Sequence, residues 1–186
     1  MQIILQPVLF EPDKDILSSL EKALLKEFNA SFSSSIVTAP AIKQIPEQLF
    51  DRQRNQWKST DILEWLSVNY TKLYYSKGRR STTKILAIWD FDAYSDKLNF
   101  VFGEAHLDDR ICAIYLPRLR QEFYGLKPDK SLFCLRLVKE AVHELGHAFG
   151  LTHCESIKCV MHFSNSLDDT DIKTSHLCNV CRGYLV

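Results

Sequence analysis

A run of histidines and glycines near the C-terminal end constrains this chain more than any other feature. Residues 143–153 read HELGHAFGLTH, which is the pattern H-E-x-x-H-x-x-G-x-x-H. Histidines four residues apart lie on one face of a helix, so the imidazoles of His143 and His147 can reach one tetrahedral metal ion. Gly150 lets the helix end in a left-handed turn, which returns His153 to the same point. The pattern therefore predicts a site with three histidine ligands.

The motif falls at the end of a predicted helix from about Ser131 to Phe149. This segment is apolar nearly all round, so we expect it to pass through the middle of the molecule. Either Asp129 or Ser131 is a suitable N-cap. Glu144 lies about 100° round the helix from His143, where it cannot easily ligate the metal but can reach a metal-bound water. Two buried core histidines are the alternative reading of the helix alone.

Alternating apolar segments of two kinds precede this helix. The predicted strands are residues 2–10, 35–39, 84–89 and 111–116, with an edge strand at 99–102, and the predicted helices are 13–28 and 60–75. The polar stretch 50–58 is expected to be a loop. Strands that alternate with helices predict an α/β fold, with a mixed, mostly parallel twisted sheet covered by helices. We expect one domain over residues 1–186, with a sheet-and-helix part (1–150) and a short irregular C-terminal part (151–186).

Charge and hydropathy exclude several kinds of partner. The 186 residues carry 23 basic and 23 acidic side chains, which cancel. Nucleic acid and anionic membranes bind clustered, uncompensated Lys and Arg, so neither is expected as a partner. No apolar run reaches the roughly 18 residues that would cross a bilayer, and the first residues do not resemble a signal peptide. We therefore expect a soluble, cytoplasmic protein, and a monomer.

Six cysteines are the one unusual feature of the composition. Cys112 and Cys134 stand alone in apolar segments and are expected to be inert core thiols. The other four lie close together in the last part of the chain, namely Cys154, Cys159, Cys178 and Cys181. Thiols in a reducing compartment favour metal binding, and two pairs suit a closed tetrahedral site. Two disulfides are the alternative, and His162 or His176 could replace one thiol.

The extended motif resembles the metzincin metallopeptidases, which also have a methionine turn beneath the metal. Met161 follows His153 by eight residues, a short interval for that group. The archaemetzincin family has this spacing, with a Cys directly after the third His, then x4-C-x-M and a C-x-x-C. This chain matches with Cys154, Cys159-Val160-Met161 and the pair Cys178/Cys181. The resemblance covers residues 138–181.

The resemblance implies a metzincin-like fold and a peptidase with two zinc ions. His143, His147 and His153 would hold a catalytic zinc, and the four C-terminal cysteines a structural one. Glu144 would act as the general base toward a zinc-activated water that attacks the scissile carbonyl. Met161 would pack under the imidazoles. A catalytically silent, zinc-stabilised peptide-binding module and the hydrolysis of a non-peptide amide are the alternative functions.

Substrate recognition is less marked in the sequence. A peptide or protein substrate would pair with an edge strand within residues 100–106. The family resemblance raises an aminopeptidase-like activity, for which Glu104 is the candidate that holds the substrate α-ammonium; a solvated surface glutamate is the alternative. Tyr115, His162 and Tyr184 are equal candidates for stabilising the oxyanion.

Overall fold

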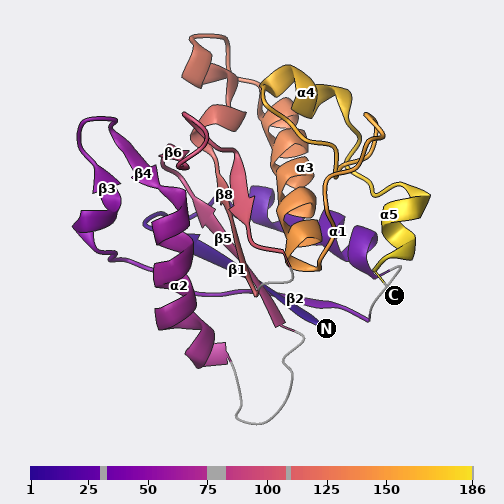
Figure 1. The fold of residues 1–186 in the computed structure, drawn as a ribbon, viewed down its shortest axis with the longest axis horizontal. Helices are drawn as coiled ribbons and strands as arrows, with labels where there is room; N and C mark the ends of the chain where they lie inside the picture. Colours follow the sequence, from indigo (N-terminus) through magenta and orange to yellow (C-terminus); the bar gives the residue numbers. More distant parts are fainter. Residues whose placement is uncertain (30–32, 75–82, 108–109, 186) are drawn as a thin grey trace.

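A five-stranded sheet forms the centre of the molecule (Figure 1). The computed structural model describes residues 1–29, 33–74, 83–107 and 110–185. The strands of this sheet are β1 (Gln2–Val8), β2 (Ser35–Thr38), β5 (Thr83–Trp89), β7 (Gly103–Ala105) and β8 (Ile111–Tyr115). Their order is β2-β1-β5-β8-β7, and every pair is parallel except β7 with β8. The expected mixed, mostly parallel sheet is confirmed, and β7 lies at its edge.

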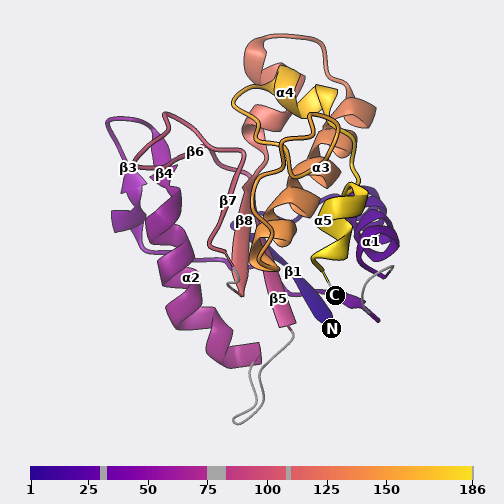
Figure 2. The same ribbon diagram turned by 45° about the vertical axis from the view of Figure 1, so that its right-hand side comes forward.

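Helices cover both faces of the sheet (Figures 1 and 2). α1 (Lys14–Phe28) and α3 (Lys130–Ala148) pack on one face, and α2 (Ser59–Tyr74) packs on the other. Successive strand residues point to opposite faces, so Ile3 joins the cluster under α1 and α3 while Ile4 joins the cluster under α2. A sheet buried on both faces explains why its strands are almost continuously apolar in sequence.

The helix α3 carries the motif and is buried along most of its length. It begins after Asp129, whose carboxylate accepts a hydrogen bond from the backbone N–H of Leu132 at 2.9 Å. Its bounds agree with the predicted helix to within one residue at each end. One side of α3 packs on β7 and β8, and the other side faces the C-terminal part of the chain (Figure 2). The histidine motif therefore lies between the edge of the sheet and the C-terminal part.

The C-terminal part contains two short helices, α4 (Leu167–Ile172) and α5 (Asn179–Gly183), and is otherwise irregular. It is fastened to α1 through Glu27, whose side chain is 3% exposed. One oxygen of Glu27 accepts the backbone N–H of Leu177 at 2.9 Å and pairs with the Arg182 guanidinium at 2.5 Å. It is fastened to α3 by Lys139, whose ammonium donates to the backbone carbonyl of Thr170 at 2.9 Å. These contacts hold the C-terminal part against α1 and α3.

Two expectations about the sheet edges were wrong. Residues 50–58 contain β3 (Phe50–Asp51) and β4 (Gln56–Lys58), which form a second sheet with β6 (Ala93–Tyr94). The strands form because Trp57 is buried and pairs with Ala93, a long-range contact that local polarity does not reveal. The edge strand lies at 103–105 and not at 99–102, since pairing with β8 begins at Gly103.

The remaining boundaries lie within two residues of those predicted. Residue 75, the expected end of the second helix, falls outside the described residues. Three short 3-10 helices complete the fold, η1 (Glu47–Leu49), η2 (Pro117–Leu119) and η3 (Gln121–Tyr124). None of the helices in the described ranges is both long enough and apolar enough to pass through a bilayer.

Candidate metal centre and active site

The end of α3 turns the chain so that the third histidine reaches the first two. Gly150 has a φ of 92°, in the left-handed region. The N–H of Gly150 donates to the carbonyl of His147 at 2.8 Å, and that of Leu151 to the carbonyl of Gly146 at 2.9 Å. This pair of bonds is a Schellman motif, in which a residue without Cβ relieves the strain of the turn. Residues after Gly150 therefore run back beneath the helix.

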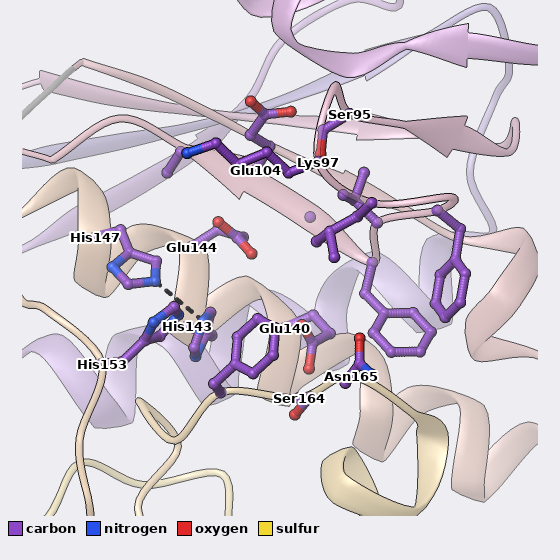
Figure 3. A pocket seen from close by; sticks show the side chains of 17 residues that line it. Ser95, Lys97, Glu104, Glu140, His143, Glu144, His147, His153, Ser164 and Asn165 are labelled. Atoms are coloured by element: carbon purple, nitrogen blue, oxygen red, sulfur yellow. Dashed lines mark hydrogen bonds between the residues drawn. The ribbon is translucent and has the colours of Figure 1, made fainter.

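Three imidazoles converge at this turn (Figure 3). The Nε2 atoms of His143 and His147 are 3.1 Å apart, and the ligand atoms of all three histidines lie within 4.8 Å of one another. A tetrahedral zinc at about 2.0–2.1 Å from each nitrogen would space two such atoms by roughly 3.3 Å. The donor set therefore fits a zinc ion.

Backbone carbonyl groups fix the Nδ1 atoms of His143 and His147. His143 Nδ1 lies 2.8 Å from the Val160 carbonyl oxygen, and His147 Nδ1 lies 2.7 Å from that of Leu151. A carbonyl oxygen only accepts, so each Nδ1 carries the proton and each Nε2 presents a lone pair. Burial is the main cause that lowers the pKa of all three histidines, and it lowers the pKa of His143 well below its usual value. The imidazoles are therefore neutral, the form that binds metal.

Met161 packs closely against α3 at Gly146, which has no side chain. A Cβ at Gly146 would collide with the Sδ atom of Met161, which is completely buried. The turn is also tied to the third histidine, since the N–H of Cys154 donates to the Met161 carbonyl at 2.9 Å. Gly146, the second variable position of H-E-x-x-H, therefore leaves the space that Met161 fills.

Glu144 lies beside the histidines and against the edge strand. Glu144 is 4% exposed, and no described residue donates a hydrogen bond to its carboxylate. An ideal Cβ on Gly103 would lie 2.5 Å from Glu144 Cγ and Oε1, so the carboxylate occupies the space that a side chain on β7 would fill. Burial, with a smaller effect of Glu140, raises the pKa of Glu144 well above its usual value, which Lys173 partly opposes. Glu144 is thus positioned by packing and has high proton affinity.

A cavity of about 230 Å³ opens in front of these groups. Its lining includes the three histidines, Glu144, Glu140 and residues 100–105 of the edge segment. Glu104 also lines it, but on the α2 side of β7, where its Oε1 accepts a hydrogen bond from Thr60 Oγ1 at 2.9 Å. The other oxygen, Oε2, is shielded from solvent and has no partner among the described residues. Figure 3 shows the Glu104 carboxylate turned away from the histidines.

The three oxyanion candidates lie away from the cavity lining. Tyr115 is buried on the α2 face, where its hydroxyl lies 2.7 Å from Ser59 Oγ and burial raises its pKa. His162 Nδ1 donates to the Cys154 carbonyl oxygen at 2.8 Å, and Tyr184 is 75% exposed on α5. None of them is among the described residues that line the cavity.

Four free thiols gather beside the third histidine. The sulfur atoms of Cys154, Cys159, Cys178 and Cys181 all lie within 4.8 Å of one another. Both Cys154 to Cys178 and Cys159 to Cys181 are separated by 3.8 Å between Sγ atoms. Zinc–sulfur bonds of about 2.3 Å in a tetrahedron predict roughly the same spacing. The N–H of Cys181 is the main group that lowers the pKa of Cys178, to about 7.

Reasoning from the sequence missed two features of the site, Gly103 and a buried ion pair. The Nζ of Lys173 lies 3.1 Å from Glu140 Oε1, and the two side chains are 0% and 4% exposed. Glu140 lies one helical turn before Glu144, and this spacing of two glutamates on the motif helix is visible in the sequence. Its partner lies 33 positions further along the chain, and no spacing rule connects them.

A helix with two histidines and a glutamate, completed by a third histidine after a sharp turn, defines a zinc metallopeptidase. Comparison with known proteins gives the same class: residues 44–185 match the model of peptidase family M54. The chain is 40% identical to an archaemetzincin of Methanocaldococcus jannaschii over 97% of its own length and 90% of that protein. The chain belongs to the archaemetzincin family.

The chain is also similar to solved structures. The archaemetzincin of Archaeoglobus fulgidus, complexed with malonate, is 31% identical and has a TM-score of 0.75 over 99% of both chains. A zinc-dependent peptidase of Methanocorpusculum labreanum is 29% identical, with a TM-score of 0.79 over 99% of this chain and 100% of the other.

Proposed function

We propose that the chain cleaves peptide bonds with a zinc ion held by His143, His147 and His153, and with Glu144 as general base. When bound, zinc acidifies a water molecule and polarises the substrate carbonyl. Glu144 takes the proton of the attacking water and then delivers it to the leaving amine. The observation that carries this proposal is the buried Glu144 carboxylate, which has no hydrogen-bond partner among the described residues and lines the same cavity as the three imidazoles.

A second, structural zinc is proposed at Cys154, Cys159, Cys178 and Cys181. The 3.8 Å spacing of the sulfur atoms and the low pKa of Cys178 support it. A four-thiolate site leaves no position for water, so this ion would hold the fold and take no part in hydrolysis. Because Cys154 follows His153 directly, this ion would also hold the third histidine of the catalytic site in place. Free thiols of this kind suit a reducing compartment, and we expect the protein to act in the cytoplasm.

We further propose that Glu104 binds the α-ammonium of the substrate, which would make the activity aminopeptidase-like. The support is that Glu104 is among the residues that line the cavity and that its Oε2 has no partner among the described residues. To bind the α-ammonium, the carboxylate would turn from the α2 side of β7 toward the histidines. Glu104→Gln should then lower kcat/KM for peptides with a free N-terminus and leave N-acetylated peptides unaffected. Equal rates on both kinds of peptide, before and after the substitution, would remove Glu104 from the site.

Metal analysis combined with a peptide-library digest tests the proposal. We expect two zinc ions per chain in the wild type and in Glu144→Ala, and cleavage only by the wild type. Zinc missing from the histidines would contradict the metallopeptidase model. Cleavage that survives in Glu144→Ala would contradict the role of the base and leave the metal sites standing.

A further inference from the structure

Glu140 is a buried residue of α3 whose carboxylate lines the active-site cavity. The residue is 3% exposed, yet it lines the cavity together with Glu144, one helical turn later. Its Oε1 pairs with Lys173 Nζ at 3.1 Å and accepts the Thr170 hydroxyl at 3.3 Å. No described residue donates to its Oε2. One oxygen of a carboxylate is therefore held by the protein, and the other is left for whatever enters the cavity.

Aromatic side chains line the same cavity as Glu140. Phe100 and Phe102 line one part of the cavity, with ring centroids 5.3 Å apart, and Phe163 lines another, 5.1 Å from the ring of His153. A cavity of about 150 Å³ is enough to bind benzene, so this cavity of about 230 Å³ has room for an aromatic side chain.

Ser164 also lines the cavity, with a shielded hydroxyl that has no partner among the described residues. Figure 3 shows Glu140, Ser164 and Asn165 at the end of the cavity away from Glu104.

The charge of Glu140 is already balanced. Lys173 is completely shielded from solvent and lies at the same carboxylate, while Lys97 lines the cavity near Glu104. A cationic substrate side chain at Glu140 would lie beside Lys173 and the proposed zinc, and both would repel it. A purely apolar one would leave Glu140 Oε2 dehydrated without a partner, which is costly for a charged acceptor. A neutral hydrogen-bond donor on an aromatic ring satisfies both conditions.

We propose that this cavity is a side-chain pocket that selects tyrosine next to the scissile bond. The phenol ring would pack against the phenylalanines that line the cavity, and its hydroxyl would donate to Glu140 Oε2. The hydroxyl oxygen would remain free to accept a hydrogen bond from Ser164. Glu140 is thereby a specificity residue, and the inference rests on the peptidase function proposed above.

Matched peptides test the selectivity of the wild-type holoenzyme. A cleaved sequence from the library digest is resynthesised with Tyr, Phe or Lys at the position before the scissile bond, and separately at the position after it. At one of the two positions we expect kcat/KM for Tyr to exceed that for Phe by about tenfold or more, because a hydrogen bond to a charged group is lost with Phe. Lys should be cleaved more slowly than Tyr. Equal rates for Tyr and Phe at both positions, or a preference for Lys, would overturn the proposal.

A pair of double variants separates Glu140 from the packing around it. Glu140→Leu with Lys173→Met replaces the whole ion pair by apolar groups, so no charge is left buried alone. The Tyr to Phe ratio should fall to within about twofold. Arg136→Met with Asp171→Leu is the matched control, because this pair also joins α3 to the C-terminal part, with 2.6 Å between Nη2 and Oδ2, and neither residue lines the cavity. An unchanged ratio in the first variant, or an equal loss in both, would contradict the assignment of Glu140.

Binding distinguishes failure of this inference from failure of the proposed function. The zinc-loaded Glu144→Gln protein is titrated with the same fluorescently labelled Tyr and Phe peptides. Tighter binding of the Tyr peptide would support the pocket even if the wild type cleaved nothing. Cleavage without a preference for Tyr in rate or in binding would remove the pocket and leave the peptidase function intact.

Discussion

Gly103 on the edge strand and Glu144 on the central helix share one volume: an ideal Cβ at Gly103 would lie 2.5 Å from Glu144 Oε1. Gly103→Ala should therefore push the carboxylate away from its place beside the histidines. We expect kcat to fall by about 100-fold, the usual consequence of an ångström-scale misplacement of a reacting group. The zinc content should remain that of the wild type, because none of the ligands moves.

A second glycine serves as the control for this change. Gly183→Ala also adds one methyl group, and no atom lies within 4 Å of the new Cβ. Its kcat and zinc content should match those of the wild type. Full activity of Gly103→Ala in steady-state assays would mean that Glu144 does not depend on the space at Gly103.

Gly146→Ala should destabilise the protein although alanine is the better helix former. Alanine gains about 1 kcal/mol over glycine in a helix interior, but its Cβ would collide with Met161 Sδ. Overpacking of a core costs about 1–3 kcal/mol, so we expect a net loss in the free energy of unfolding measured by urea denaturation. Adding Met161→Ala to Gly146→Ala should recover part of that loss. A Gly146→Ala protein more stable than the wild type would show that the methionine yields freely.

Cys178→Ser should remove one of the two proposed zinc ions. The remaining three thiols cannot close a tetrahedral site, so metal analysis should find one zinc per chain and the midpoint of thermal unfolding should fall. Cys134→Ser is the control, since Cys134 lies on α3 outside the thiol cluster. Two zinc ions in Cys178→Ser would place the second ion elsewhere.

Asp169 makes stability depend on pH in the acid range. Hydrogen bonds from the Ser166 hydroxyl, and from the N–H groups of Asn165 and Ser166, lower the pKa of Asp169 in the folded chain. A carboxyl whose pKa is lower in the folded state stabilises above its unfolded pKa of about 4, and this contribution is lost as the pH falls through the folded value. Asp169→Asn should therefore be less stable than the wild type at pH 7. The difference should vanish in strong acid.

Urea unfolding of both proteins at pH 7 and in strong acid measures this difference. Acid also protonates the metal ligands, but that loss is common to the two proteins and cancels in the comparison. A difference that stays constant with pH would mean that the Asp169 carboxylate does not need its charge.

The central helix was predictable from sequence because its signal is local. Apolar periodicity, the Asp129 cap and Gly150 all lie within or beside residues 130–148, and the histidine spacing follows from helical geometry. β7 was misplaced because Gly103-Glu104-Ala105 has no apolar alternation; it is a strand only through its pairing with β8. β4 and β6 likewise depend on a contact between Trp57 and Ala93.

The same division holds within the site. The ligands and Glu144 belong to one continuous motif, whereas the Lys173 partner of Glu140 and the space at Gly103 are set by tertiary packing. A single sequence contains no rule that pairs a lysine on one segment with a glutamate 33 residues earlier. The features of the site that could not be predicted are therefore those that depend on packing of the central helix against distant parts of the chain.

The anchoring of the C-terminal part by Glu27 has a consequence for biosynthesis. Its partners, Leu177 and Arg182, lie 150 and 155 residues further along the chain. The carbonyl of Val160, which orients His143, belongs to the segment that this anchor fastens. During translation, the contacts between Glu27 and the C-terminal part can form only after Leu177 and Arg182 have emerged from the ribosome, long after α1 has done so. A nascent chain that stops before Leu177 therefore lacks these contacts, and cannot use them to hold the Val160 segment against His143.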